Sequence, residues 1–261
     1  MIDWVEVQKA LTPVKNFEDL CHRLQGSFGY PFVSEVFNIT LAELEIYTHR
    51  LLGGDSKGRY SEYVSRLTGI LSGLQKAGVV NVLDLLERTS SRQRSEAFVG
   101  QSGIPATEIV MLLKYLIYWF IPSEKYLSGL VRDDPDIQAA IKALSRCGIR
   151  TNLQLLQAGI SLAGRKDLAI QCGLSLKVIN QLVNRADFSR LPWSSKATIS
   201  NIIGAGYTDL ASLANANPER LYTDFFAYGR SIGKNLKLGN EIENSYRIAK
   251  IVPVLVQGDL E

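Results

Sequence analysis

The stretch LSRCGIRTNLQLL at residues 144–156 decides the fold, because it repeats the stretch LQKAGVVNVLDLL at residues 74–86 after an interval of 70 residues. The same interval relates Gly103 to Gly173. A looser third copy follows, with its repeat glycine at Gly206. Repetition of this kind is typical of supersecondary units that stack on one another and bury a shared core.

Within each copy, apolar residues recur every three or four positions, which indicates helices. Each helical stripe ends at a glycine that can adopt the left-handed conformation of a helix end. Asn81, Thr151 and Thr208 then stand ahead of the next apolar group as candidate caps. Each copy therefore predicts a helix, a glycine turn and a short helix.

The second half of each copy predicts a helical hairpin. The turns are Gly103-Ile104-Pro105 in the first copy and Gly173-Leu174-Ser175 in the second, where Ser175 can cap the following helix. The apolar, aromatic-rich stretch 115–120 is expected to form the central helix. Long alternating strand patterns are absent. We predict an all-α fold of tandem helix-hairpin-helix-like repeats that share a continuous helical core.

The predicted organisation has three parts. Residues 1–58 form an N-terminal helical region, 59–132 the first repeat, and 133–261 the second and third repeats. Residues 53–58 resemble a phosphate-binding loop only superficially, because Arg59-Tyr60 follows where that loop needs a lysine and a hydroxyl residue. We interpret them as an interhelical loop. The connector 123–136 is the expected boundary between repeats.

Composition excludes several classes of protein. The 261 residues are 46% hydrophobic and 21% charged, as in globular proteins. The N-terminus is acidic and predicts no export signal. The longest apolar stretch, Ile109 to Ile121, is interrupted by Lys114 and is shorter than the ~20 residues of a membrane span. We expect a cytoplasmic protein with no membrane contact.

Cysteine and histidine usage argues against catalysis. Three cysteines without a signal indicate a reducing compartment. Cys147 and Cys172 precede repeat glycines at a position that is small elsewhere, so packing is favoured over metal binding or redox work. His22 and His49 stand apart from any cluster with metal-ligand spacing. We predict no enzyme activity, no metal and no cofactor.

The C-terminal half is distinctly basic. Residues 142–250 hold 15 basic and 7 acidic side chains, whereas residues 1–141 hold 14 basic and 17 acidic ones. The start of a hairpin's second helix exposes backbone amides that bind phosphate oxygens. The DNA-binding form of this motif carries a second turn glycine that both hairpins here lack. The candidate nucleic-acid-binding residues are Arg146, Arg150, Arg165, Lys166, Gly173, Ser175, Lys177, Arg185 and Arg190.

Three segments carry a resemblance to a known family. They are NRADFSRL at 184–191, GYTDLASLA at 206–214 and NPERL at 217–221. Together they resemble the bacterial and archaeal domain of unknown function numbered 4332, over about residues 140–253. The family is similar to helix-hairpin-helix modules and to the C-terminal domain of the RNA polymerase α subunit. The resemblance implies a helical, DNA-contacting architecture and brings no established activity.

Two functional hypotheses follow. The first is a non-enzymatic binding protein that contacts DNA or RNA phosphates through its basic C-terminal hairpins. The alternative is a helical adaptor or scaffold that binds another protein or itself. Clustering of the basic residues on one face would favour the first. Family members often carry a Gly-x-Gly hairpin after the Arg-Leu step, where this chain has Pro192-Trp193-Ser194-Ser195. Trp193 is expected to pack over the repeat junction or, if exposed, to stack on a partner.

Overall fold

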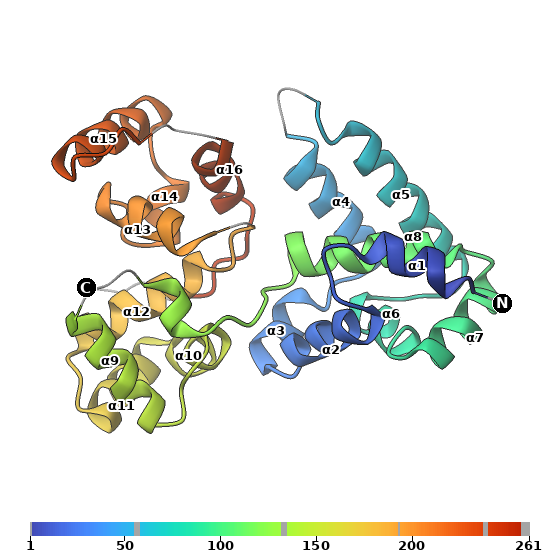
Figure 1. Ribbon diagram of the computed structural model, residues 1–261, viewed down its shortest axis with the longest axis horizontal. Helices are drawn as coiled ribbons and strands as arrows, with labels where there is room; N and C mark the ends of the chain where they lie inside the picture. Colours follow the sequence, from blue (N-terminus) through green and yellow to red (C-terminus); the bar gives the residue numbers. More distant parts are fainter. Residues whose placement is uncertain (1, 55–57, 132–134, 193, 237–239, 257–261) are drawn as a thin grey trace. The chain divides into compact units, whose positions relative to one another are not determined.

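The computed structural model describes residues 2–54, 58–131, 135–192, 194–236 and 240–256, and these residues form helices and turns without a β-sheet (Figure 1). The all-α prediction is thereby confirmed. The chain divides into two compact units, Met1–Ser123 and Glu124–Glu261. The predictions for Trp193 and for residues 133 and 134 concern positions outside the described residues.

The first unit packs its helices around the segment that ends at Phe120. Its helices are α1 Trp4–Leu11, α2 Phe17–Phe28, α3 Pro31–Phe37, α4 Leu41–Leu52, α5 Ser61–Lys76, α6 Val82–Arg88, α7 Arg92–Ser102 and α8 Ala106–Tyr115. A π-helical turn, η1 Leu116–Phe120, continues α8. Figure 1 shows α1 lying along α8, and α4 beside α5. Tyr115 is fully buried, with its hydroxyl 2.8 Å from Thr48 Oγ1.

The second unit places the predicted hairpin on a buried short helix. Its helices are the 3-10 turn η2 Leu127–Leu130, α9 Pro135–Arg146, α10 Asn152–Gly159, α11 Leu162–Cys172, α12 Leu176–Phe188, α13 Lys196–Gly204, α14 Leu210–Ala214, α15 Pro218–Ser231 and α16 Asn240–Ala249. Helix α10 packs on both α11 and α12. The apolar face of α12 that contains Ile179, Leu182 and Val183 is fully buried.

Glycine turns separate the helices at the predicted positions. Gly78 and Gly148, after α5 and α9, have φ values of +76° and +86°, which side chains with a Cβ disfavour. Asn81 and Thr151 cap the next helices, as predicted. In the third copy the cap is Asp209 rather than Thr208. The carboxylate of Asp209 accepts the Ser212 amide at 2.7 Å, so α14 begins one residue later than the sequence suggested.

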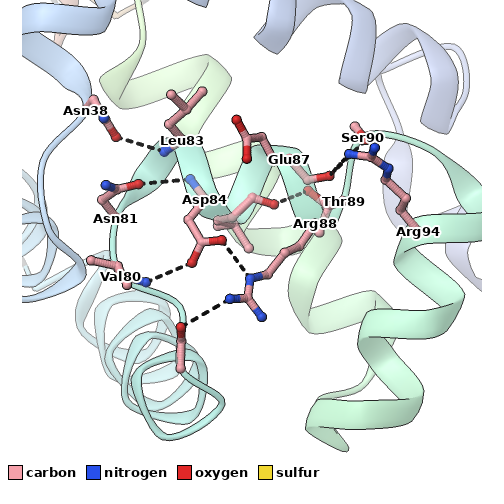
Figure 2. A network of polar contacts seen from close by, with 12 residues as sticks. Asn38, Val80, Asn81, Leu83, Asp84, Glu87, Arg88, Thr89, Ser90 and Arg94 are labelled. Carbon is pink, nitrogen blue, oxygen red and sulfur yellow. Dashed lines mark hydrogen bonds and ion pairs between the residues drawn. The ribbon is translucent and has the colours of Figure 1, made fainter.

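Figure 2 shows how the start of α6 is held. Asn81 Oδ1 accepts the Asp84 amide at 2.9 Å, and Asp84 Oδ2 accepts the Val80 amide at 3.0 Å. The start of α10 uses the same two bonds. Thr151 Oγ1 accepts the Gln154 amide at 3.3 Å, and Gln154 Oε1 accepts the Arg150 amide at 2.8 Å. Isolated antiparallel bridges also join Asn81 to Thr40 and Thr151 to Tyr126.

These parallels support the tandem repeat, which itself stays a prediction, together with its continuous core. The division at residues 58 and 132 also stays a prediction. Helices α4 and α5, on either side of residue 58, pack together within the first unit. No single helix among the described residues is long and apolar enough to cross a membrane; α7 taken with α8 and η1 passes that test only as a pair bent by 116°.

Candidate nucleic-acid interface

The hairpin turn between α11 and α12 is built by local sequence. Gly173 ends α11 in the left-handed conformation with φ +64°, and the Leu174 amide returns to the Ala169 carbonyl at 2.9 Å. Ser175 then caps α12 by accepting the Val178 amide at 3.3 Å. Ser175 and Lys177 are exposed, and the first turn of α12 holds no acidic residue. The positive end of the α12 dipole therefore faces solvent beside a lysine.

The end of α9 lies against this turn. Cys147 Sγ, directly after α9, lies 3.7 Å from the Gln171 carbonyl oxygen near the end of α11. Arg146, the last residue of α9, directly precedes Cys147, and its side chain is exposed. Neither Arg146 nor Lys177 forms an ion pair with another residue of the described ranges. We call Arg146, Gly173, Ser175 and Lys177 the hairpin surface.

Arg150 and Lys166 are also exposed, and neither pairs with a carboxylate among the residues that the structure describes. Lys166 lies on α11, one turn before Ile170, whose side chain is 82% exposed. Arg150 precedes α10, where its backbone amide is used by Gln154. Within the described ranges, no ion pair joins these two side chains to the hairpin surface.

Comparison with known proteins agrees with the resemblance seen in the sequence. Residues 137–239 match the family model of a domain of unknown function, DUF4332. The match begins in α9 and includes the whole α11–α12 hairpin. No curated protein and no solved structure matches the chain. We call residues 137–239 the DUF4332 segment, and the family description names no activity for it.

Two predicted residues of the DUF4332 segment are buried, which removes them from a surface interface. Arg165 is 2% exposed, and its Nη1 donates to the carbonyls of Gly159 and Ile160 at 3.2 Å. Arg190 is 9% exposed and pairs with Asp187, while its Nη2 donates to the Pro253 carbonyl at 3.0 Å. Both guanidinium groups bind within the protein, so they bridge elements rather than contact phosphate.

Burial also governs the acid beside Arg190. Removal from water raises the pKa of Asp187 above its usual value, although the charge and hydrogen bond of Arg190 oppose this shift.

Arg185 is half-buried, and its Nη1 lies 3.5 Å from Ser200 Oγ on α13. Of the nine predicted residues, four form the hairpin surface, two lie exposed elsewhere, one is half-buried and two are structural.

Sequence reasoning missed a cavity of about 250 Å³ in the second unit. Asn180, Asn184 and Asp187 line it from one face of α12, and Arg165 and Asp209 complete its polar wall. Their spacing of three and four residues on α12 is the only signal in the sequence that could have indicated this face. No group of three or more metal-ligating side chains occurs within the described ranges.

Proposed function

We propose that the DUF4332 segment binds nucleic-acid phosphates through the hairpin surface and catalyses no reaction. The observation that carries the proposal is the exposed start of α12, which holds Lys177 and no acidic residue in its first turn. The exposed Arg146 ends α9 one residue before Cys147, whose Sγ lies 3.7 Å from the Gln171 carbonyl near the end of α11. We place this activity in the cytoplasm, because the three thiols are free.

The groups of the hairpin surface attract an anion in different ways. Unbonded amides at the start of a helix point at a bound anion, and the helix dipole adds about half a positive charge there. Lys177 and Arg146 add full charges that can follow a phosphate chain. The exposed Arg150 and Lys166 belong to the same unit. Lysine and arginine contacts to phosphate position a protein on a duplex without reading its sequence.

One observation favours the adaptor as a second candidate. Tyr222 and Phe226, one turn apart on α15, are 44% and 49% exposed. Adjacent exposed aromatic side chains are common at protein interfaces. They carry less weight than the hairpin surface, because two half-exposed rings form only a small apolar patch.

Salt dependence tests the proposal. We expect the full chain to bind a fluorescein-labelled duplex of random sequence at ~50 mM salt, with a log–log salt slope of roughly −3 to −4 for about four phosphate contacts. The double variant Arg146→Ala with Lys177→Ala should flatten the slope by about two units. Both side chains are exposed, so the variant should keep its helical circular dichroism.

The matched control is Arg230→Ala with Lys234→Ala, which removes the same charge from exposed positions at the end of α15. We expect its slope to equal that of the parent chain. Absence of binding at ~50 mM salt, or an equal effect of the two double variants, would contradict the proposal and favour the adaptor.

A further inference from the structure

Two of the three thiols lie together at the end of the hairpin. Cys172 is the last residue of α11, and Cys147 directly follows α9. Cys147 Sγ lies 3.7 Å from the carbonyl oxygen of Gln171, the group bonded to the Cys172 amide. The pKa of the Cys172 thiol is raised first by burial and then by the neighbouring Cys147 thiol. The loop between them contains α10 and most of α11.

The pair differs from the third thiol in access. Cys147 and Cys172 are both half-buried, so small reagents can reach them. Cys21 is only 6% exposed, and its thiol donates to the Thr89 carbonyl at 3.2 Å. The chain therefore holds an internal control for its own thiol chemistry.

Packing alone does not require sulfur at these positions. The corresponding residues of the first copy are Ala77 and Ser102, and both are half-buried like the cysteines. The fold thus accepts small side chains without sulfur at both places. Sulfur at both places in one copy, with Cys147 Sγ beside the carbonyl that precedes Cys172, calls for a chemical explanation.

We propose that Cys147 and Cys172 form a reversible intrachain disulfide when a peroxide is present. This modification site goes beyond phosphate binding and does not depend on it. Transient disulfides of this kind occur in otherwise reducing compartments.

The reaction balances with a peroxide as the oxidant. The Cys147 thiolate attacks one peroxide oxygen and the O–O bond breaks, which gives a sulfenic acid and hydroxide. The hydroxide takes up the proton that the Cys147 thiol released and leaves as one water. The sulfur of Cys172 then attacks the sulfenic sulfur; hydroxide leaves and takes the Cys172 proton as a second water. Two thiols and one hydrogen peroxide thus give one disulfide and two waters. A small thiol reverses the step by exchange.

The order of attack follows from burial. Removal from water, together with the hydrogen bond to Cys147, raises the pKa of Cys172 to about 12. This shift disfavours the thiolate of Cys172, and the thiolate is the nucleophilic form. We assign the first attack to Cys147 and the resolving step to Cys172.

Trypsin isolates the two cysteines on separate peptides, residues 147–150 and 167–177. The reduced full chain is treated with hydrogen peroxide, unfolded, alkylated with N-ethylmaleimide and digested. We expect one linked peptide that joins these two segments and disappears after dithiothreitol, while Cys21 is recovered in its alkylated form. The chain should thus lose two of its three thiols.

Cys147→Ala and Cys172→Ser are the matched variants, since they install the residues of the first copy. Both should stay folded by circular dichroism and give no linked peptide. Recovery of the two wild-type peptides separately, as alkylated or sulfinic forms, would overturn the proposal. A linkage found only in a covalent dimer on a non-reducing gel would also overturn it.

Discussion

The first and second copies, residues 61–115 and 135–188, use the same local devices but handle charge differently. In each copy, a glycine in the left-handed conformation follows the first helix, and a polar side chain caps the second. The side chain three residues after the cap then accepts the backbone amide of the residue just before the cap. These devices are local, so the two copies can share them while their surfaces diverge.

In the first copy, Arg88 and Arg94 bind a carboxylate and a carbonyl. Arg88 pairs with Asp84 at 2.7 Å, and Arg94 donates to the Glu87 carbonyl at 3.1 Å (Figure 2). Burial alone would raise the pKa of Asp84, but the hydrogen bonds from Arg88 and the Val80 amide, with the charge of Arg88, lower it. In the second copy, Arg146 and Lys177 are exposed and unpaired within the described residues.

The interiors differ as well, at equivalent positions. Ser95 and Arg165 are both buried, and each donates to the carbonyl six residues before it, that of Thr89 or Gly159. A threonine in the first copy is thus a glycine in the second, beside a much larger donor. The two copies therefore keep the same side-chain bond to a backbone carbonyl. The second copy combines the larger arginine with the smaller glycine.

The largest expected effect on the free energy of unfolding comes from adding a side chain at Gly159. A Cβ added at Gly159 would lie 2.7 Å from Cγ2 of Val183, a short side chain that is fully buried. Gly159→Thr, which installs the residue of the first copy, should lower the free energy of unfolding by about 3 kcal/mol. Urea unfolding measures it. Gly100→Ala in α7, where a Cβ meets nothing within 4 Å, should instead raise the free energy of unfolding by about 0.5–1 kcal/mol. Equal effects of the two substitutions on this free energy would contradict the packing difference between the two copies.

A smaller effect concerns Lys125, whose carbonyl accepts the Asn152 amide at the start of α10. The Ile39 carbonyl accepts the Val82 amide at the start of α6 in the same way. Burial lowers the pKa of Lys125 from 10.5 to about 8. The unfolded chain then binds more protons between these two values, so the free energy of unfolding should rise with pH across that window, by about 3 kcal/mol.

Lys125→Ile should abolish this rise, which urea unfolding of both chains at the two ends of the window would reveal. Taking the difference between chains cancels the titration of other groups. An identical pH dependence for the two chains would contradict the assignment of Lys125 as a buried ammonium, whose Nζ donates to the Ser189 carbonyl at 2.8 Å.

The smallest effect concerns Arg88, whose counterpart is Ala158. Arg88→Ala removes the ion pair with Asp84, in which the two side chains are 37% and 25% exposed. Because such pairs are screened by water, we expect a loss of only about 0.5–1 kcal/mol in thermal unfolding, diminishing at high salt. A loss well above this range would mean that the first copy needs its charge network for folding.

Much of the fold could be predicted because its signals are local. Glycines at helix ends and the caps Asn81 and Thr151 act through the adjacent backbone, so the sequence shows them directly. The cap at Asp209 was missed because two neighbouring residues, Thr208 and Asp209, both suit a cap, and the choice depends on the register of α14.

The site was harder to predict because exposure is set by tertiary packing. Arg165 and Lys166 are neighbours in sequence, yet one is buried and the other exposed. The signal for Arg165 was its place three residues before Leu168, on the apolar face of α11. For Arg190 the signal was Asp187 at a spacing of three residues, which makes an ion pair within one turn.

The most direct test of the central claim compares charge removal in the two hairpins. The salt slope of duplex binding is measured for Arg146→Ala with Lys177→Ala and for Lys76→Ala with Arg94→Ala, all exposed positions. Lys76 is the counterpart of Arg146. We predict that the second-copy pair flattens the slope by about two units and that the first-copy pair leaves it unchanged. Equal slopes for the two variants, or a larger loss from the first-copy pair, would contradict the account.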